Sequence, residues 1–201
     1  MHGHIDGFYK NRDYGFGPEE SGTSHISIVD KYGNIISMTS TIESSFGSKI
    51  MANGYLLNNE LTDFSFIPKN ENGLVANRVQ PGKRPRSSMT PTIVFDKSTN
   101  EPILVIGSAG GSRIIGHVTQ RIIDVLYHKK SLGESISAPH LLSRGNGIEA
   151  ESITSREMHL KEMGHEVRVK KLQSGINAIY FNKNLIYGEA DPRRHGKALG
   201  K

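Results

Sequence analysis

The sequence predicts a layered α+β domain in which the strands pair mainly antiparallel and helices pack on the sheet. Segments with strand character follow one another in runs instead of alternating with helices, and the clearest helical pattern directly follows a strand and a glycine pair. The composition, with 35% hydrophobic and 22% charged residues, argues against collagen-like, coiled-coil and wholly disordered chains. With 201 residues and no cysteine, the chain is long enough to bury a core without disulfides.

The first strands are expected after a polar N-terminal stretch. Residues 1–22 are rich in glycine and polar side chains without periodicity, and we interpret them as a tail or linker. The segments HISIVD (25–30) and IISMTST (35–41) alternate or carry β-branched residues, and the KYGN turn between them predicts a β-hairpin. Residues 44–89 are rich in loop-forming residues, and only YLLNNEL indicates a short ordered piece.

The strongest secondary-structure signal lies in the second half. After two strands at TPTIVFD and PILVIGS, Gly110 and Gly111 lead into RIIGHVTQRIIDVLYHKK, whose apolar residues recur at helical spacing. Ser112 is the expected cap of this helix, and His117 is expected on its polar face. The remaining predicted elements are short helices at 133–137 and 155–163 and late strands at HEVRVK, NAIYF and NLIYGE.

Charge and motif spacing argue against several kinds of partner. The net charge is +5, but the basic residues are spread along the chain, with local concentrations at 83–86 and 193–197 and no aromatic platform. We therefore expect a solvated basic surface and no nucleic acid, and a basic binding domain for an acidic polymer is the alternative. No apolar run is long enough to span a membrane, and the nine histidines lack metal-ligand spacing, so we expect no metal and no cofactor.

Two glycine-containing sites could support acyl chemistry. Gly110 and Gly111 at a helix start leave backbone N–H groups that favour a developing oxyanion, although the pair alone indicates no more than a tight turn. Thr23 follows Gly22 where the polar stretch meets the first strand. A threonine at a chain terminus carries a base in its own α-amine, and the preceding glycine lets the backbone reach the geometry for attack on its carbonyl. Taken by itself, the dipeptide carries no signal.

Two groups on the loop-rich segment could bind ions. The run KRPRSS combines positive charge with the hydroxyls of Ser87 and Ser88 and could hold a carboxylate or phosphate, and a basic surface turn is the alternative. In a shared pocket, Glu43, Glu60 and Asp63 would hold an ammonium group and raise one another's pKa. Scattered acidic residues on loops are usually just solvated.

Five segments occur in an order typical of one family. They are GTSHISIVDKYGNIISMTSTIESSFGS, LLNNELTDFS, PGKRPRSSMTPTIVF, GSAGGSRII and GEADPRR, and they resemble the successive motifs of the gamma-glutamyltransferase small subunit. The resemblance implies an N-terminal-nucleophile hydrolase fold, a four-layer αββα sandwich made by two subunits cut from one precursor. It divides the chain into residues 1–22, which look like the end of a large subunit, and residues 23–201, a small-subunit-like domain that supplies half of the sandwich.

The resemblance also implies a reaction. The precursor is expected to cleave itself between Gly22 and Thr23, after which the Thr23 hydroxyl attacks a γ-glutamyl amide such as glutathione. Water or an amino-acid or peptide acceptor then resolves the acyl-enzyme. Thr41 matches the threonine that hydrogen-bonds the nucleophile, and Gly110 and Gly111 match the pair that forms the oxyanion hole.

Donor binding is implied for five further residues. Ser87 and Ser88 match the pair that binds the glutamyl α-carboxylate. Glu43, Glu60 and Asp63 match the positions that hold the α-ammonium group, although many relatives carry asparagine at the first of these. The charge balance around the ammonium group is therefore expected to differ from theirs.

Two other departures concern the shape of the site. Ala109 replaces a proline that is common in the glycine motif, which is expected to loosen the oxyanion turn. The stretch 66–82 is shorter than the lid loop of some relatives and has Asn72 where they have tyrosine, so a more open pocket is expected.

Length is the largest departure. Family precursors place a large subunit of several hundred residues before the threonine, including an arginine that clamps the donor carboxylate, whereas 22 residues precede Thr23 here. The hypothesis is a fragment or split gene product that has little activity without a large subunit, and an inactive remnant or partner subunit is the alternative. A periplasmic or extracellular location is expected from the family alone, because residues 1–22 contain no apolar stretch of a secretory signal.

Overall fold

The computed structural model describes residues 22–143, 147–183 and 185–200. By its internal contacts the chain forms two compact units. We call them the loop unit (Met1–Gly22 and Ile42–Ser87) and the sheet unit (Thr23–Thr41 and Ser88–Lys201). The tail predicted for residues 1–22 lies almost wholly outside the described residues, and the domain boundary before Thr23 stays a prediction.

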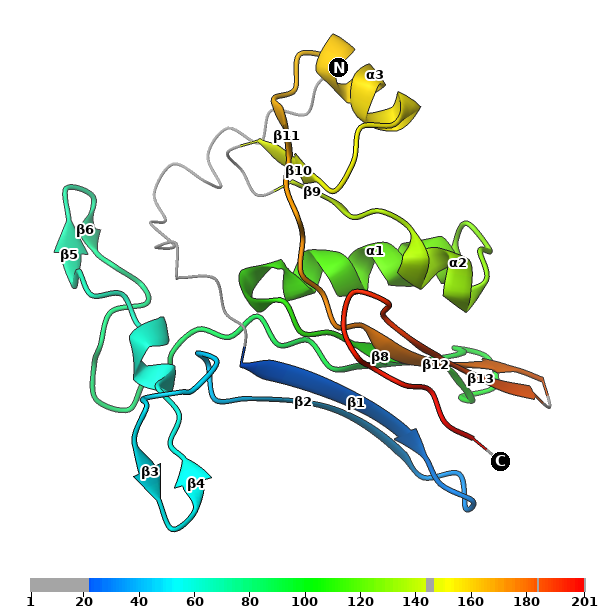
Figure 1. The fold of residues 1–201 in the computed structure, drawn as a ribbon, viewed down its shortest axis with the longest axis horizontal. Coiled ribbons are helices and arrows are strands. Elements are labelled where there is room, and N and C mark those ends of the chain that lie inside the picture. Colours follow the sequence, from blue (N-terminus) through cyan, green and yellow to red (C-terminus); the bar gives the residue numbers. More distant parts are fainter. Residues whose placement is uncertain (1–21, 144–146, 184, 201) are drawn as a thin grey trace. The chain divides into compact units, whose positions relative to one another are not determined.

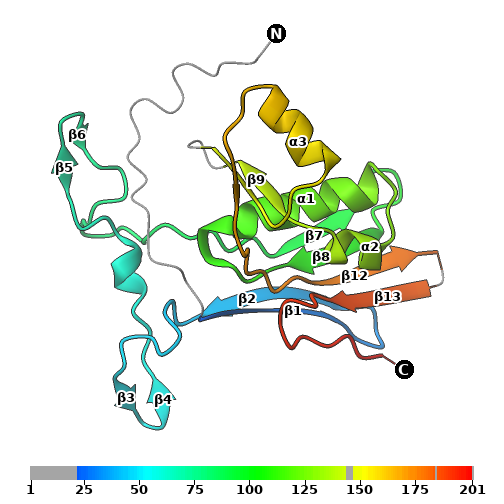
Figure 2. The same cartoon turned by 45° about the horizontal axis from the view of Figure 1, so that its top comes forward.

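A four-stranded antiparallel sheet in the order β13–β12–β8–β7 forms the centre of the sheet unit. Its strands are β7 (Thr92–Phe95), β8 (Pro102–Gly107), β12 (Asn177–Asn182) and β13 (Leu185–Ala190). Leu104, Val105 and Ile106 of β8 are fully buried, because elements pack on both faces of this strand. Helix α1 covers one face and a β-hairpin covers the other (Figures 1 and 2).

The hairpin consists of β1 (Thr23–Val29) and β2 (Ile35–Thr41), as predicted. Its antiparallel register pairs Thr23 with Thr41 at the open end. At the turn, the Asp30 carboxylate accepts hydrogen bonds from the backbone N–H groups of Tyr32 and Asn34 at 2.8 and 2.9 Å. Helix, sheet and hairpin thus pack as successive layers, in agreement with the layered α+β architecture predicted.

Helices α1 (Ile114–Leu126) and α2 (Leu132–Ser137) bury their apolar side chains against the central sheet. The predicted long helix is confirmed, but it begins at Ile114, with Arg113 at the N-cap position. The expectation that Ser112 caps it is wrong, because the glycine pair imposes one short 3-10 turn, Gly111–Arg113, before the α-helix starts.

A small three-stranded sheet completes the sheet unit. It contains β9 (Leu141–Ser143), β10 (Ile148–Ala150) and β11 (Val167–Val169), and α3 (Ser155–Glu162) connects the last two. The β10–β11 pair is parallel, whereas the strand pairs of the hairpin and of the central sheet are antiparallel. The predicted prevalence of antiparallel pairing is therefore confirmed. The strands β9 and β10 were not predicted from the sequence.

The described part of the loop unit, residues 22 and 42–87, has little regular structure. Its elements there are two minimal hairpins and a 3-10 turn, namely β3 (Met51–Ala52), β4 (Tyr55–Leu56), the 3-10 helix Glu60–Asp63, β5 (Lys69–Asn70) and β6 (Gly73–Leu74). The expected short piece at YLLNNEL is β4 together with the start of the 3-10 helix. Among the helices of the described residues, none is both long enough and apolar enough to cross a membrane.

Candidate active site

Thr23 is the first residue of β1, and only 3% of its surface is exposed. The antiparallel register places it opposite Thr41, the last residue of β2. The Thr23 hydroxyl donates a hydrogen bond to the Thr41 hydroxyl at 3.0 Å. Strand pairing therefore brings the predicted nucleophile and its predicted partner together and fixes the direction of the Thr23 side chain.

The peptide group before Thr23 is held by the segment that follows β2. The Gly22 N–H donates to the Glu43 carbonyl oxygen at 3.1 Å, and the Gly22 carbonyl accepts from the Ile42 N–H at 3.4 Å. A Cβ atom at Gly22 would lie 2.4 Å from the Ser44 carbonyl oxygen. Glycine is therefore required at this position by the close approach of two backbone segments.

Within the sheet unit, Arg194 binds the backbone of Thr23. Its Nη1 donates to the Thr23 carbonyl oxygen at 3.0 Å, and its side chain packs over Gly175, where a Cβ atom would lie 2.9 Å from Cδ. The expectation of a solvated surface at 193–197 is thus wrong for Arg193 and Arg194. Both are half-buried, because their guanidinium groups bind carbonyl and carboxylate oxygens of the sheet unit.

The glycine turn (residues 108–111) connects β8 to the 3-10 turn before α1. Gly110 and Gly111 are buried and have φ angles of +131° and +60°, a backbone region that favours glycine. A Cβ atom at Gly110 would lie 2.6 Å from the Gln173 carbonyl oxygen and 3.2 Å from the His117 ring. Substitution of either glycine would therefore strain a tightly packed turn.

A cavity of about 310 Å³ in the sheet unit is bordered by both the nucleophile strand and the glycine turn. Its lining includes Ser24 and His25 of β1, Ala109 of the turn, and also Gly175 and Arg194. The Ala109 N–H donates to the Gly175 carbonyl at 3.3 Å, which fixes one wall of the cavity to the other.

His25 is a residue of this site that sequence reasoning missed. It lies two residues after Thr23, on the same buried side of β1, and its ring nitrogens contact the hydroxyls of Thr39 at 2.8 Å and Ser27 at 3.1 Å. Burial lowers the pKa of His25 to about 4, so the ring is neutral near pH 7. The strand alternation that places it beside Thr23 was the available signal.

Within the loop unit, the three predicted carboxylates interact. Glu43 is 2% exposed and has a φ of +71°, and its carboxylate accepts hydrogen bonds from the Ser44 hydroxyl at 2.6 Å and from the Asn59 side-chain amide. Burial raises the pKa of Glu60, and the charges of Asp63 and Glu43 raise it further. Burial and the Glu43 charge likewise raise the pKa of Asp63. Neighbouring carboxylates thus raise the pKa of both residues, although the hydrogen bond with Glu60 lowers that of Asp63, so the two do not raise each other's pKa.

Ser87 and Ser88 lie in the irregular segment before β7. Ser87 is exposed and ends the loop unit, whereas Ser88 is half-buried and begins a segment of the sheet unit. Directly before them, the Arg86 N–H donates to the Asn77 side-chain oxygen at 3.1 Å. The Arg86 charge opposes the rise in the pKa of Asp63, so the basic run is electrostatically coupled to the carboxylates.

The expectation that His117 lies on the polar face of α1 is wrong. The side chain is fully buried, and its ring centroid lies 3.9 Å from that of His140. Burial, reinforced by the Arg121 charge, lowers the pKa of His117 to about 4. The buried face of α1 also holds Arg121 and Asp124, which pair at 3.1 Å, so the spacing of apolar residues could not reveal its full width.

Comparison with solved structures defines the class of the fold. A Helicobacter pylori gamma-glutamyltranspeptidase T380A mutant matches with a TM-score of 0.75 at 38% identity, over 85% of this chain and 99% of that chain. A Pseudomonas nitroreducens gamma-glutamyltranspeptidase complexed with L-DON gives 0.76 at 33% identity, over 88% and 98%. With a buried threonine at the start of the first strand of such a layered sheet, the fold is that of an N-terminal-nucleophile hydrolase.

The particular family follows from the sequence match. The gamma-glutamyltranspeptidase family model matches residues 6–201, and the chain belongs to this family. The glutathione hydrolase proenzyme of Bacillus subtilis (strain 168) is 36% identical over 90% of this chain and 31% of its own length. That of Escherichia coli (strain K12) is 36% identical over 87% of this chain and 32% of its own. The chain therefore spans about a third of the length of these relatives.

Proposed function

We propose that this chain catalyses γ-glutamyl transfer and hydrolysis on glutathione and related γ-glutamyl amides. Thr23, released by autocleavage, would be the nucleophile. The observation that carries the proposal is the buried Thr23 hydroxyl, bonded to Thr41 and directly preceded by a glycine held on both its N–H and its carbonyl. The names of the relatives, glutathione hydrolase proenzymes, support both the donor and the precursor.

Autocleavage would begin with attack of the Thr23 hydroxyl on the Gly22 carbonyl carbon. The peptide C–N bond breaks and an ester to the Thr23 side chain forms, and water then hydrolyses the ester. The products are a carboxylate at Gly22 and a free α-amine at Thr23. The Ile42 N–H, which already binds the Gly22 carbonyl, supports this step because it faces the oxygen that gains negative charge.

In the catalytic cycle, the α-amine of Thr23 would take the proton of its own hydroxyl as the oxygen attacks the γ-glutamyl carbonyl. Backbone N–H groups of Gly110 and Gly111 would stabilise the oxyanion. Collapse of this intermediate expels the leaving amine, which takes the proton from the α-ammonium group, and an acyl-enzyme remains. Water or an acceptor amine then attacks the ester and restores the hydroxyl.

The charged groups would recognise the glutamyl end of the donor. Glu43, Glu60 and Asp63 would bind its α-ammonium group, and Ser87 and Ser88 its α-carboxylate. The proposal is supported by the mutual coupling of the carboxylates, which favours a cationic ligand because a bound cation relieves their repulsion.

A large subunit is the proposed protein partner. On one face of the hairpin, the cross-strand pairs Ile26–Met38 and Ile28–Ile36 form an apolar row whose members are 40–51% exposed. The opposite face of the hairpin packs on the central sheet. An apolar sheet face of this kind is usually covered by another layer, and a large subunit would supply it.

Intact-mass measurement and turnover of a γ-glutamyl anilide test the proposal together. We expect loss of residues 1–22, no cleavage in Thr23→Ala, and slower cleavage in Thr23→Ser, which keeps the hydroxyl but loses the methyl that holds its rotamer. Ser24→Ala, one residue further on, is the matched control and should cleave normally. A stable full-length species without turnover, with or without an added large subunit, would instead identify the chain as an inactive remnant or partner subunit.

A further inference from the structure

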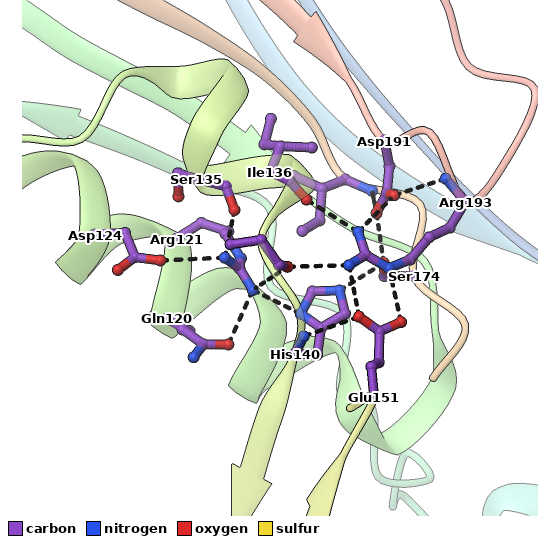
Figure 3. Close-up of polar contacts among 12 residues, drawn as sticks. Gln120, Arg121, Asp124, Ser135, Ile136, His140, Glu151, Ser174, Asp191 and Arg193 are labelled. Atoms are coloured by element: carbon purple, nitrogen blue, oxygen red, sulfur yellow. Dashed lines mark hydrogen bonds and ion pairs between the residues drawn. The ribbon is translucent and has the colours of Figure 1, made fainter. Parts of the chain in front are cut away.

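Four polar side chains form a buried relay within the sheet unit (Figure 3). Arg121, His140, Ser174 and Asp191 are each at most 2% exposed. Arg121 Nη2 lies 2.9 Å from His140 Nδ1, and His140 Nε2 lies 2.8 Å from the Ser174 hydroxyl, which in turn bonds to the Asp191 carboxylate. The family resemblance implied no role for any of the four, although Asp191 lies in the GEADPRR segment.

The donors and acceptors in the relay can be ordered in one way. An arginine side chain only donates, so His140 Nδ1 accepts and the ring proton is on Nε2. His140 Nε2 therefore donates to Ser174, whose own hydroxyl hydrogen goes to Asp191. Burial lowers the pKa of His140, and the neutral ring that this order requires is the form present near pH 7.

The relay includes Ser174 of the segment 173–176, which we call the support segment because it is hydrogen-bonded to the glycine turn. The Gly175 N–H donates to the Ser108 hydroxyl, and the Gly175 carbonyl accepts from the Ala109 N–H, both at 3.3 Å. The Ile176 N–H donates to Asp191 at 3.2 Å, so the same carboxylate holds both Ser174 and the backbone of the segment. The Gln173 carbonyl borders the space beside the α-carbon of Gly110.

His140 also reaches the glycine turn by a second route. Its ring packs against that of His117, tilted by 43° with the centroids 3.9 Å apart, and the His117 ring borders the same space beside Gly110 as the Gln173 carbonyl. The position of one histidine is therefore transmitted to the turn through hydrogen bonds on one side and ring packing on the other.

We infer that His140 is a positioning residue that holds the support segment, and through it the glycine turn, in the conformation that directs the glycine N–H groups. The inference rests on the proposed function, in which these N–H groups stabilise the oxyanion. Because the oxyanion forms only after attack on the donor, in the tetrahedral intermediate and the transition states beside it, a displaced turn lowers kcat and leaves donor binding nearly unchanged.

The test compares three variants of the 201-residue chain with a matched control. His140→Leu removes both hydrogen bonds, Ser174→Ala cuts the relay at its next member, and His140→Gln restores one acceptor and one donor. His159→Asn, at an exposed histidine of α3, is the control. We expect kcat to fall by about tenfold or more in the first two variants with KM within about twofold, a loss of roughly one such hydrogen bond in the transition state.

Two further results are expected of the same variants. His140→Gln should recover most of the lost kcat, because its amide presents an acceptor and a donor at a spacing close to that of the imidazole nitrogens. The amide protons of Ala109 and Gly175 should exchange with solvent about tenfold faster in His140→Leu and Ser174→Ala, since their acceptors are no longer fixed.

Several results would overturn the inference. They are an unchanged kcat in a folded Ser174→Ala variant, a change in KM alone, no recovery in His140→Gln, or unchanged exchange of the two amides. If the unmodified chain neither cleaves nor turns over donor, the proposed function fails. The exchange rates then still decide whether His140 supports the turn.

Discussion

At the residue scale, burial shifts the pKa values of histidines and of carboxylates in opposite directions. It lowers the pKa of His25 and His117 to about 4, which keeps both rings neutral, and raises the pKa of Glu60 and Asp63. The fold therefore disfavours the ionised form of both carboxylates, so ionising them costs stability. A site that binds a cation is expected to bear such a cost when empty.

Asp63→Asn should therefore stabilise the free protein and weaken donor binding. The folded-state pKa of Asp63 lies above its ordinary value of 3.8, so the ionised carboxylate destabilises the fold above the folded pKa, and this penalty is absent below about pH 3.8. We expect a higher free energy of unfolding in urea at pH 7 and no difference near pH 3. The donor KM should rise by about tenfold with kcat little changed.

Asp30→Asn is the control, because its expected effect on the free energy of unfolding at pH 7 has the opposite sign. Hydrogen bonds from Asn34 lower the pKa of Asp30, so this carboxylate stabilises the fold above pH 3.8 and loses that effect as the pH falls through the lowered pKa. The variant should be less stable than the parent at pH 7, and the donor KM should not change. A loss of stability in Asp63→Asn at pH 7 would contradict the repulsion between the carboxylates.

The close approach of Gly107 to the His25 ring leads to a second prediction at this scale. A Cβ atom at Gly107 would lie 2.2 Å from the His25 ring, so Gly107→Ala should destabilise the chain by about 1–3 kcal/mol through overpacking beneath the nucleophile strand. Gly133→Ala meets nothing closer than 3.7 Å and should be neutral or stabilising by about 0.5–1 kcal/mol. Denaturant unfolding of both variants measures the contrast, and equal effects would refute it.

At the element scale, strands and helices were predictable where one periodic pattern was long. The hairpin, the strands of the central sheet and α1 have clear apolar spacing, and the structure contains each of them. β9 and β10 escaped prediction because each has three residues without alternation in the flanking sequence, whereas the equally short β11 lies in the alternating HEVRVK. The buried position of His117 escaped it because the buried face of α1 extends beyond its apolar residues: Arg121 and Asp124 pair there, and the His117 ring packs on that of His140.

Helix α2 allows a prediction for a single element. The Ser131 hydroxyl accepts from the Glu134 N–H at 3.3 Å, and the Glu134 carboxylate accepts from the Ser131 N–H at 3.0 Å, which forms a capping box. Ser131→Ala should lower the free energy of unfolding by about 1 kcal/mol. Ser137→Ala, at the exposed end of the same helix, should have little effect in the same urea titration.

At the scale of the whole molecule, the exposed apolar row of the hairpin has consequences for the chain alone. Replacing the cross-strand pair by Ile28→Thr and Ile36→Thr keeps β-branched residues but breaks up the row. We expect weaker binding of a hydrophobic dye and less self-association in light scattering, with the hairpin retained. The control pair Leu185→Thr and Ile186→Thr lies on alternate faces of β13 and should change neither signal.

Local periodicity and motifs along the chain were enough to predict the class of fold and the family, and to suggest candidate site residues. The contacts of His25, of Arg194 and of the relay through His140 came to light only in the folded molecule. Their contacts join residues far apart in the chain, such as Arg194 with Thr23, and no local pattern encodes such a pairing. Whether a polar side chain is solvated or buried depends on whether another segment supplies its hydrogen-bond partner, and only the folded structure shows that partner.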